Sequence, residues 1–208
     1  FTPIYIILGK MKIFRFINHN ILNDETLIDQ VGIVTIPDTA LLIQKRPFFI
    51  PDFTQNCTAQ LCFCIRINRL GRSIHQHFAR RYYQSSDISL GVHFVAEDLL
   101  HTPQEKGMPW DMALGFDNAV AIAEPVNLAS STIDAQIRIN EDGASFPIEW
   151  EHLCRVADSL ISYISQHYTL RQGDLLLIPA SIAGKIVHID DRLTLALAGN
   201  EVLSFNIK

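Results

Sequence analysis

The clearest hydrophobic pattern in the chain is an alternation between Thr58 and Asn68. Apolar side chains at every second position share one face, and polar residues or cysteines share the other: Ala59, Leu61, Phe63, Ile65 and Ile67 against Gln60, Cys62, Cys64 and Arg66. Because successive side chains of a strand point to opposite faces of a sheet, this period of two predicts a β-strand.

Shorter apolar runs predict further strands along most of the chain. They lie at 11–17, 32–36, 88–94, 118–123, 135–140, 175–178, 185–189, 193–197 and 202–207, with a small hairpin from 41–43 and 48–50. Helical spacing predicts two main helices, at 73–84 and 149–167, the second entered through a turn at 141–143. Many short strands and two main helices favour an α+β fold that is mostly β.

Composition indicates an ordinary globular protein. The 208 residues are 48% hydrophobic and 19% charged, and the net charge of −5 gives no electrostatic reason to expect nucleic acid or an anionic membrane as a partner. We predict one domain at 11–208. Residues 1–10 form an appended segment in this interpretation, because Met11 resembles a natural start and the apolar run Ile4–Leu8 is too short to span a bilayer.

The four cysteines indicate a reducing compartment. Cys62 and Cys64 share a strand face, where a disulfide between them is excluded by geometry, and the set lacks the spacing of a zinc site. We therefore predict buried, reduced and inert thiols in a cytoplasmic protein.

Several segments, in one order along the chain, carry a resemblance to a known family. Gly107-Met-Pro-Trp110 and Gly115-Phe-Asp117 are the most specific, and Lys45–Phe53, Ile65–Gly71 and Tyr168–Asp174 accompany them. Together they resemble the acylpyruvase branch of the fumarylacetoacetate hydrolase superfamily. The resemblance implies a mixed β-roll with two main helices, and a homodimer.

The same resemblance implies a magnesium or manganese ion, held by a Glu-x-Glu pair on one strand and an aspartate on the next. Residues two apart on a strand face the same way and can hold one ion. The matching positions here are Thr58, Gln60 and His93, and none is a carboxylate. We therefore expect no intact metal site and no cofactor.

The other functional positions implied by the family also differ. The His-x-x-Glu pair that activates water matches Asn23 and Thr26, a lysine that steadies negative charge matches Leu114, and a second lysine matches Ile36. An arginine position matches Glu97. The anion-binding loop matches Ile178, Pro179 and Ala180, where Pro179 removes a backbone donor, while Phe116 and Asp117 keep the family pattern.

These departures predict a homologue that has lost catalysis, or most of it, and acts as a dimeric scaffold, binder or regulatory partner. One alternative is an active metal-dependent hydrolase or decarboxylase of acylpyruvates or oxaloacetate with divergent ligands. Another is a small-molecule binding protein with an apolar remnant pocket and an unidentified ligand. A new metal site at His93, Glu97 and Asp98 is a further possibility, against which we favour a half-buried His93 paired with an acidic neighbour.

Overall fold

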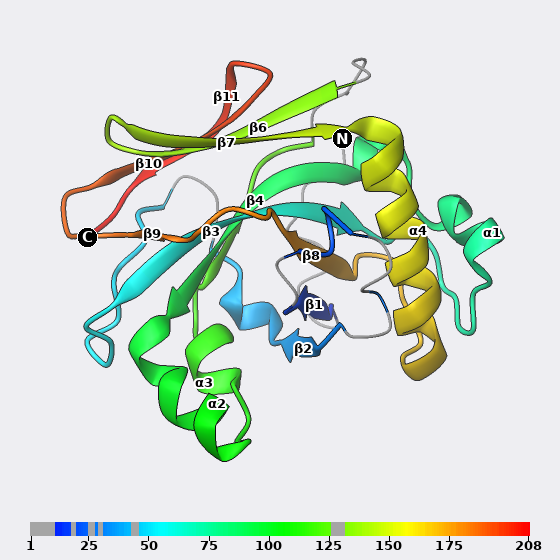
Figure 1. Ribbon diagram of the computed structural model, residues 1–208, viewed down its shortest axis with the longest axis horizontal. Helices are drawn as coiled ribbons and strands as arrows, with labels where there is room; N and C mark the ends of the chain where they lie inside the picture. The colour runs from blue at the N-terminus through cyan, green and yellow to red at the C-terminus, as the bar shows by residue number, and fades with distance from the viewer. Residues whose placement is uncertain (1–10, 18–19, 25–27, 29–30, 43–45, 126–131) are drawn as a thin grey trace.

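The computed structural model describes residues 11–17, 20–24, 28, 31–42, 46–125 and 132–208. The strands of these ranges form two curved sheets (Figure 1). The first has the order β2-β1-β8-β3-β4-β5, with β9 added to β3, and only the β1–β8 pair is parallel. Its strands are β1 (Ile13–Phe16), β2 (Ile33–Ile36), β3 (Cys57–Arg66), β4 (Ile88–Ala96), β5 (Val120–Ile122), β8 (Leu175–Pro179) and β9 (Lys185–Ile186).

The second sheet is antiparallel throughout, in the order β11-β10-β6-β7. It comprises β6 (Thr132–Ile139), β7 (Asp142–Glu149), β10 (Arg192–Leu197) and β11 (Asn200–Asn206). The turn at 141–143 therefore joins two strands and does not lead straight into a helix. Our sequence pattern missed β7 although Phe146 and Ile148 alternate with exposed neighbours, and Pro147 is tolerated because β7 is an edge strand.

Helices cover the ends of the first sheet. The long helix α4 (Trp150–His167) lies along one side, and α2 (His101–Lys106) and α3 (Asp111–Leu114) project together at the other end (Figure 1). The helix predicted at 73–84 is shorter than expected, consisting of α1 (Gln76–Ala79) and a following 3-10 turn at Arg80–Tyr82. Further 3-10 turns span Asp38–Ala40, Ser85–Asp87 and Glu97–Leu99.

The alternation in β3 divides the protein interior as predicted. Its apolar face, from Ala59 to Ile67, belongs to the main core shared by both sheets and α4, whereas Cys62 and Cys64 belong to a smaller cluster with Ile13, Ile36 and Leu177. The hairpin expected from 41–43 and 48–50 is wrong for the residues described. Leu41 forms a bridge with Val120 of β5, and Phe48 forms one with Ile207, which follows β11. The two segments therefore pair with different strands and not with each other.

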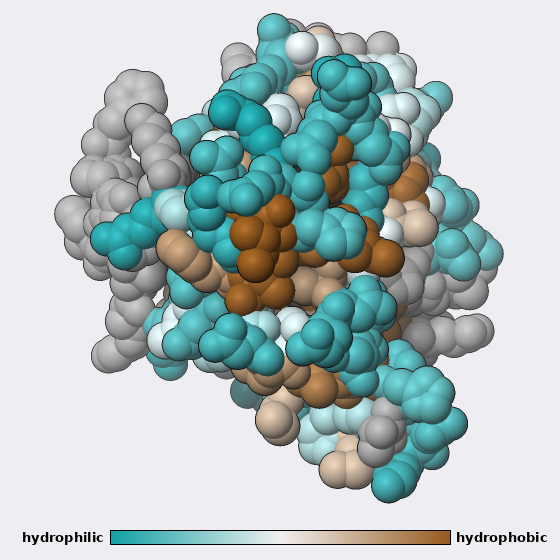
Figure 2. Space-filling view, turned by 90° about the vertical axis from the view of Figure 1, so that its left-hand side faces the viewer, coloured by the Kyte–Doolittle hydropathy of each residue, from teal (hydrophilic) through white to brown (hydrophobic). Residues whose placement is uncertain are grey.

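The mostly β fold predicted from the sequence is thus confirmed. None of the helices in the described ranges is both long enough and apolar enough to cross a membrane. On the side of the molecule shown in Figure 2, apolar side chains form a patch bordered by hydrophilic residues.

Candidate functional site

The three positions predicted to match the family's metal ligands lie together in the first sheet. Gln60 on β3 and His93 on β4 are directly opposite each other, and Thr58 points to the same face of β3 two residues before Gln60. All three side chains are buried. The structure therefore brings the predicted positions into one place, on the same side of β3 as Cys62.

Arg15 lies among these positions, and the sequence analysis did not single it out. Its side chain extends from β1 and is only 3% exposed. Nε donates to Nδ1 of His93 at 2.9 Å, one terminal nitrogen donates to Oε1 of Gln60, and the other donates to the carbonyl of Phe16. A permanently protonated group thus contacts two of the three positions that would hold the metal.

His93 is neutral in this arrangement. Its Nδ1 accepts from Arg15, so the ring proton resides on Nε2, which lies 2.7 Å from the carbonyl oxygen of Leu114 and donates to it. Burial and the charge of Arg15 lower the pKa of His93 to about 3, against the opposing effect of the Leu114 hydrogen bond. The half-buried His93 paired with an acidic neighbour was therefore a wrong prediction, since His93 is 0% exposed and its partners are a guanidinium and a carbonyl.

Thr58 and the acidic residues after β4 make separate contacts. The Thr58 hydroxyl donates to Glu97 at 2.9 Å, and Asp98 accepts from the hydroxyl of Thr54 and, at 2.8 Å, from the backbone amide of Gln55. Those amide and hydroxyl bonds lower the pKa of Asp98 despite the opposing effect of desolvation. The new metal site considered at His93, Glu97 and Asp98 is not assembled, because the three side chains point to different partners.

A divalent cation does not fit this set of residues. In the described part of the chain, no three His, Cys, Asp or Glu side chains are gathered as metal ligands. At the family positions the oxygen of Gln60 and the free lone pair of His93 already accept from Arg15. A magnesium or manganese ion there would meet the Arg15 guanidinium and no carboxylate at positions 58, 60 or 93, and the nearby Glu97 carboxylate already accepts from Thr58.

The two positions predicted to match the family's lysines carry apolar side chains that pack into the interior. Leu114 ends α3, and Ile36 ends β2; both side chains are buried. Gly115 passes close to Ile36 and Pro37, which brings the two positions near each other. Phe116 is half-buried against Phe53, whereas Asp117 is exposed.

The segment that matches the anion-binding loop lies within the sheet. Ile178 and Pro179 end β8 and pair with Phe63 and Cys62, and the backbone amide of Ala180 donates to the carbonyl of Leu61. All three residues are buried within the sheet, and the amide of Ala180 is used by Leu61 and is not offered to an anion. Asn23 lies exposed in a turn, and Thr26 falls outside the described residues.

All four cysteines are free and buried, as predicted. Burial raises the pKa of Cys62 to about 11 and that of Cys57 to about 12, and it also raises the pKa values of Cys64 and Cys154. A thiolate nucleophile in this part of the molecule is therefore not favoured at neutral pH.

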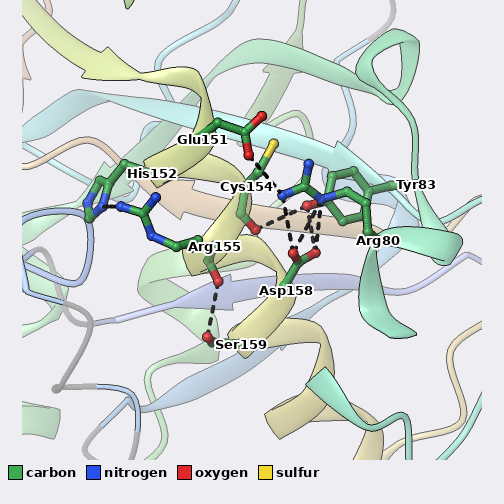
Figure 3. Close-up of polar contacts among 8 residues, drawn as sticks. All are labelled: Arg80, Tyr83, Glu151, His152, Cys154, Arg155, Asp158 and Ser159. Carbon is green, nitrogen blue, oxygen red and sulfur yellow. Dashed lines mark hydrogen bonds and ion pairs between the residues drawn. The ribbon is translucent and has the colours of Figure 1, made fainter. Parts of the chain in front are cut away.

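A second polar cluster joins the 80–83 segment to α4 (Figure 3). Arg80 lies 3.2 Å from Asp158 and 3.7 Å from Glu151, and the Tyr83 hydroxyl lies 2.8 Å from Asp158 and 3.1 Å from the carbonyl of Cys154. Its charges are paired and it lies over one face of a helix. We interpret it as a structural clamp between α4 and the segment after α1.

The chain is similar in sequence to oxaloacetate tautomerases. It is 22% identical over 171 residues to the oxaloacetate tautomerase YcgM of Escherichia coli, covering 80% of this chain and 77% of that protein. It is also 22% identical over 182 residues to a mitochondrial oxaloacetate tautomerase of Bos taurus, covering 83% and 77%. No family model matches.

Solved structures support the fold. A fumarylpyruvate hydrolase from Pseudomonas aeruginosa, in complex with Mn²⁺ and pyruvate, superposes with a TM-score of 0.80 at 18% identity and covers 94% of this chain and 88% of that chain. A fumarylacetoacetate hydrolase family protein from Yersinia pestis gives 0.80 at 20% identity, with 95% and 92% covered.

Proposed function

We propose that this member of the fumarylacetoacetate hydrolase superfamily has lost the divalent-metal site and is a non-catalytic or strongly impaired homologue. It would act as a dimeric scaffold, binder or regulatory partner. The observation that carries the proposal is the contact of the Arg15 guanidinium with both Gln60 and His93. A fixed cation in contact with these two positions, which both lack a carboxylate, leaves no favourable charge for a second cation.

The apolar side chains at the family's lysine positions support the same proposal. Leu114 and Ile36 cannot stabilise the negative charge that develops on a dioxo-acid substrate during carbon–carbon bond cleavage. Asn23, at the position of the general base, has no titratable group near neutral pH. These replacements favour a ligand more apolar than a dioxo-acid, which keeps the small-molecule binder as a variant of this proposal.

Turnover assays test the loss of catalysis. The purified chain should not convert acetylpyruvate or oxaloacetate in the presence of excess Mg²⁺ or Mn²⁺, with the E. coli tautomerase YcgM as the active control. Hydrolysis, decarboxylation and keto–enol exchange are followed separately. Metal-dependent turnover within a few orders of magnitude of ~10 s⁻¹ would falsify the proposal.

A thermal melt tests the metal site itself. Millimolar Mg²⁺ or Mn²⁺ should leave the Tm of the wild-type chain unchanged, because an ion that binds the folded state must raise it. A rise in Tm that depends on the concentration of Mn²⁺, and not on Ca²⁺ or ionic strength, would contradict the proposal.

A second candidate function is residual oxaloacetate tautomerase activity, favoured by the names of the relatives. Tautomerisation moves a proton without breaking a carbon–carbon bond, so it makes a smaller demand on the site than hydrolysis. Metal-independent keto–enol exchange that persists in a His93→Asn variant would place it elsewhere in the molecule. Exchange that is lost in that variant would favour this candidate over the non-catalytic proposal.

We further propose that residues 11–208 form one domain and that the protein is a cytoplasmic homodimer. Phe49 and Ile189 are 66% and 67% exposed, and both flank the C-terminal segment, since Ile50 and Asp190 donate to the carbonyls of Lys208 and Ile207. Apolar side chains exposed on adjoining segments are typical of a protein interface. Light scattering of the wild type and of Phe49→Asp tests the dimer, which the substitution should dissociate.

A further inference from the structure

The Arg15 side chain has an unusual environment for a buried charge. Arg15 pairs with Val34 of β2 and Leu177 of β8, so it starts within the first sheet, and its guanidinium reaches β3 and β4 on the far side of β8. Ile13, on the same face of β1, packs in the smaller cluster with Cys62. The guanidinium is therefore held between strands and away from solvent.

The partners of this guanidinium are neutral. They are the amide oxygen of Gln60, the imidazole of His93 and the carbonyl of Phe16. Within the described ranges no carboxylate lies within ion-pair distance of Arg15, and Glu97 acts on it only through space. A buried charge is costly unless it is paired, so the positive charge at this point calls for a reason other than an ordinary salt bridge.

We infer that the Arg15 guanidinium stands in for the divalent cation of the superfamily, in contact with the residues at positions 60 and 93 that would otherwise hold it. This inference rests on the proposed loss of the metal site. A metal site with three carboxylates and a dication has a net charge near −1, whereas one guanidinium with neutral acceptors has a net charge of +1. In this inference a dication held by carboxylates and a guanidinium held by neutral acceptors are alternative ways to place a cation at this position.

A specific consequence is that restoring the carboxylates is insufficient to restore the metal. Gln60→Glu and His93→Asp would each place a carboxylate beside Arg15, where it forms an ion pair with the guanidinium. Mn²⁺ would then compete with a covalently tethered cation and be repelled by it. The metal should bind only when Arg15 is removed as well.

Carboxylates are best introduced at positions 60 and 93 only, with Thr58 left unchanged. Its Cβ and Oγ1 lie 3.2 Å from the point where a Cβ on Gly184 would stand, and its hydroxyl is bonded to Glu97. A longer acidic side chain at 58 would crowd that main chain and meet the charge of Glu97. The two carboxylates at 60 and 93, which face each other across β3 and β4, are the cleaner pair.

The experiment compares Mn²⁺ binding by four proteins. These are the wild type, Gln60→Glu/His93→Asp, the same pair with Arg15→Ala, and the same pair with Arg80→Ala as a matched control. Binding is measured by the loss of the free Mn²⁺ electron paramagnetic resonance signal and by the Tm. We expect Mn²⁺ to raise the Tm by about 3–6 °C, and to bind at least about tenfold more tightly, only in the Arg15→Ala triple variant.

Equal Mn²⁺ binding by Gln60→Glu/His93→Asp and by the same pair with Arg15→Ala would overturn the inference, because Arg15 would then not compete for the position. Mn²⁺ binding by neither would also overturn it, since the guanidinium would not be filling a cation site. The proposed function fails by a different result, namely Mn²⁺ binding or metal-dependent turnover in the wild type.

A second comparison covers the case in which the triple variant does not fold. Gln60→Glu alone should keep a Tm at pH 7 that equals or exceeds that of the wild type, because Arg15 neutralises the introduced carboxylate. Gln60→Glu with Arg15→Met should melt well below Arg15→Met alone. If Gln60→Glu changes the Tm equally in the wild type and in Arg15→Met, the introduced carboxylate is not paired with Arg15 and the inference is wrong.

Discussion

Arg15 and Arg80 are both arginines within polar clusters, but their surroundings are opposite. Arg15 is almost fully buried and contacts three neutral acceptors, whereas the Arg80 side chain is 42% exposed and faces the carboxylates of Asp158 and Glu151 (Figure 3). Burial lowers the pKa of Arg15. For Arg80 burial also acts to lower the pKa, but Tyr83, Cys154 and Asp158 outweigh it and the pKa rises.

The difference shows that these arginines serve different purposes. A carboxylate partner is present where solvent already stabilises the guanidinium, and none is described where desolvation is most severe. If carboxylates were placed for stability alone, the buried Arg15 would have a carboxylate partner before the exposed Arg80 did. The Arg80 cluster is an ordinary clamp between a helix and the adjoining segment, whereas the inferred replacement of a divalent cation would account for the environment of Arg15.

Removing Arg15 should have the largest effect on stability. Arg15→Ala leaves three buried acceptors without their donor and opens a cavity in the sheet, so we expect the free energy of unfolding to fall by about 3–5 kcal/mol. Urea denaturation followed by circular dichroism measures this. A loss below ~1 kcal/mol, similar to that of a surface arginine such as Arg72→Ala, would show that the hydrogen bonds of Arg15 contribute little.

The protonation of His93 should have the next largest effect. Its folded pKa of about 3 lies below the ordinary value of 6.5, so between pH 6 and 4 the unfolded chain binds a proton that the folded chain does not. Stability from this residue is present above pH 6.5 and falls by about 1.4 kcal/mol per unit as pH drops through that window.

Urea titrations at pH 6.5, 5.5 and 4.5 measure that slope. His93→Asn should reduce it by about 1 kcal/mol per unit, and His75→Asn is measured in parallel as a substitution of an exposed histidine. Equal slopes in the wild type and His93→Asn would mean that His93 is protonated in the folded chain, which would break its hydrogen bond from Arg15.

Within the Arg80 cluster, Tyr83 should matter more than the arginine. Tyr83 is buried, and burial together with Cys154 and Asp158 raises its pKa, so it remains a neutral donor. Tyr83→Phe removes the hydrogen bond to Asp158 and keeps the ring, for an expected loss of about 1–2 kcal/mol in urea unfolding. The conservative control Tyr163→Phe, on α4 but outside the cluster, should change stability by less than ~0.5 kcal/mol.

Arg80→Ala should have the smallest effect, at most about 1 kcal/mol, because its ion pairs are exposed to solvent. The difference from the wild type should shrink further in 0.5 M NaCl, while the effect of Arg15→Ala should not. If salt reduces both effects equally, the contrast between the two arginines does not hold.

Local sequence patterns were sufficient for the main elements of the fold. The period of two in β3 specified which side chains enter the main core, and helical spacing located α4, because both depend only on where neighbouring side chains point. The pattern failed for the 41–50 segment, whose partners Val120 and Ile207 lie far along the chain. Strand pairing over such distances leaves no local signature.

By itself, the sequence determined that Thr58, Gln60 and His93 lack the charge a divalent cation requires, since residue type alone decides that. The sequence also contains a single arginine, Arg15, in the apolar run Ile13–Ile17, and a lone charge in such a run indicates a buried polar contact. Only the tertiary structure decided that a guanidinium contacts two of the positions 58, 60 and 93. Arg15 lies 45 and 78 residues from Gln60 and His93, and the strand order β1-β8-β3-β4 brings the three together.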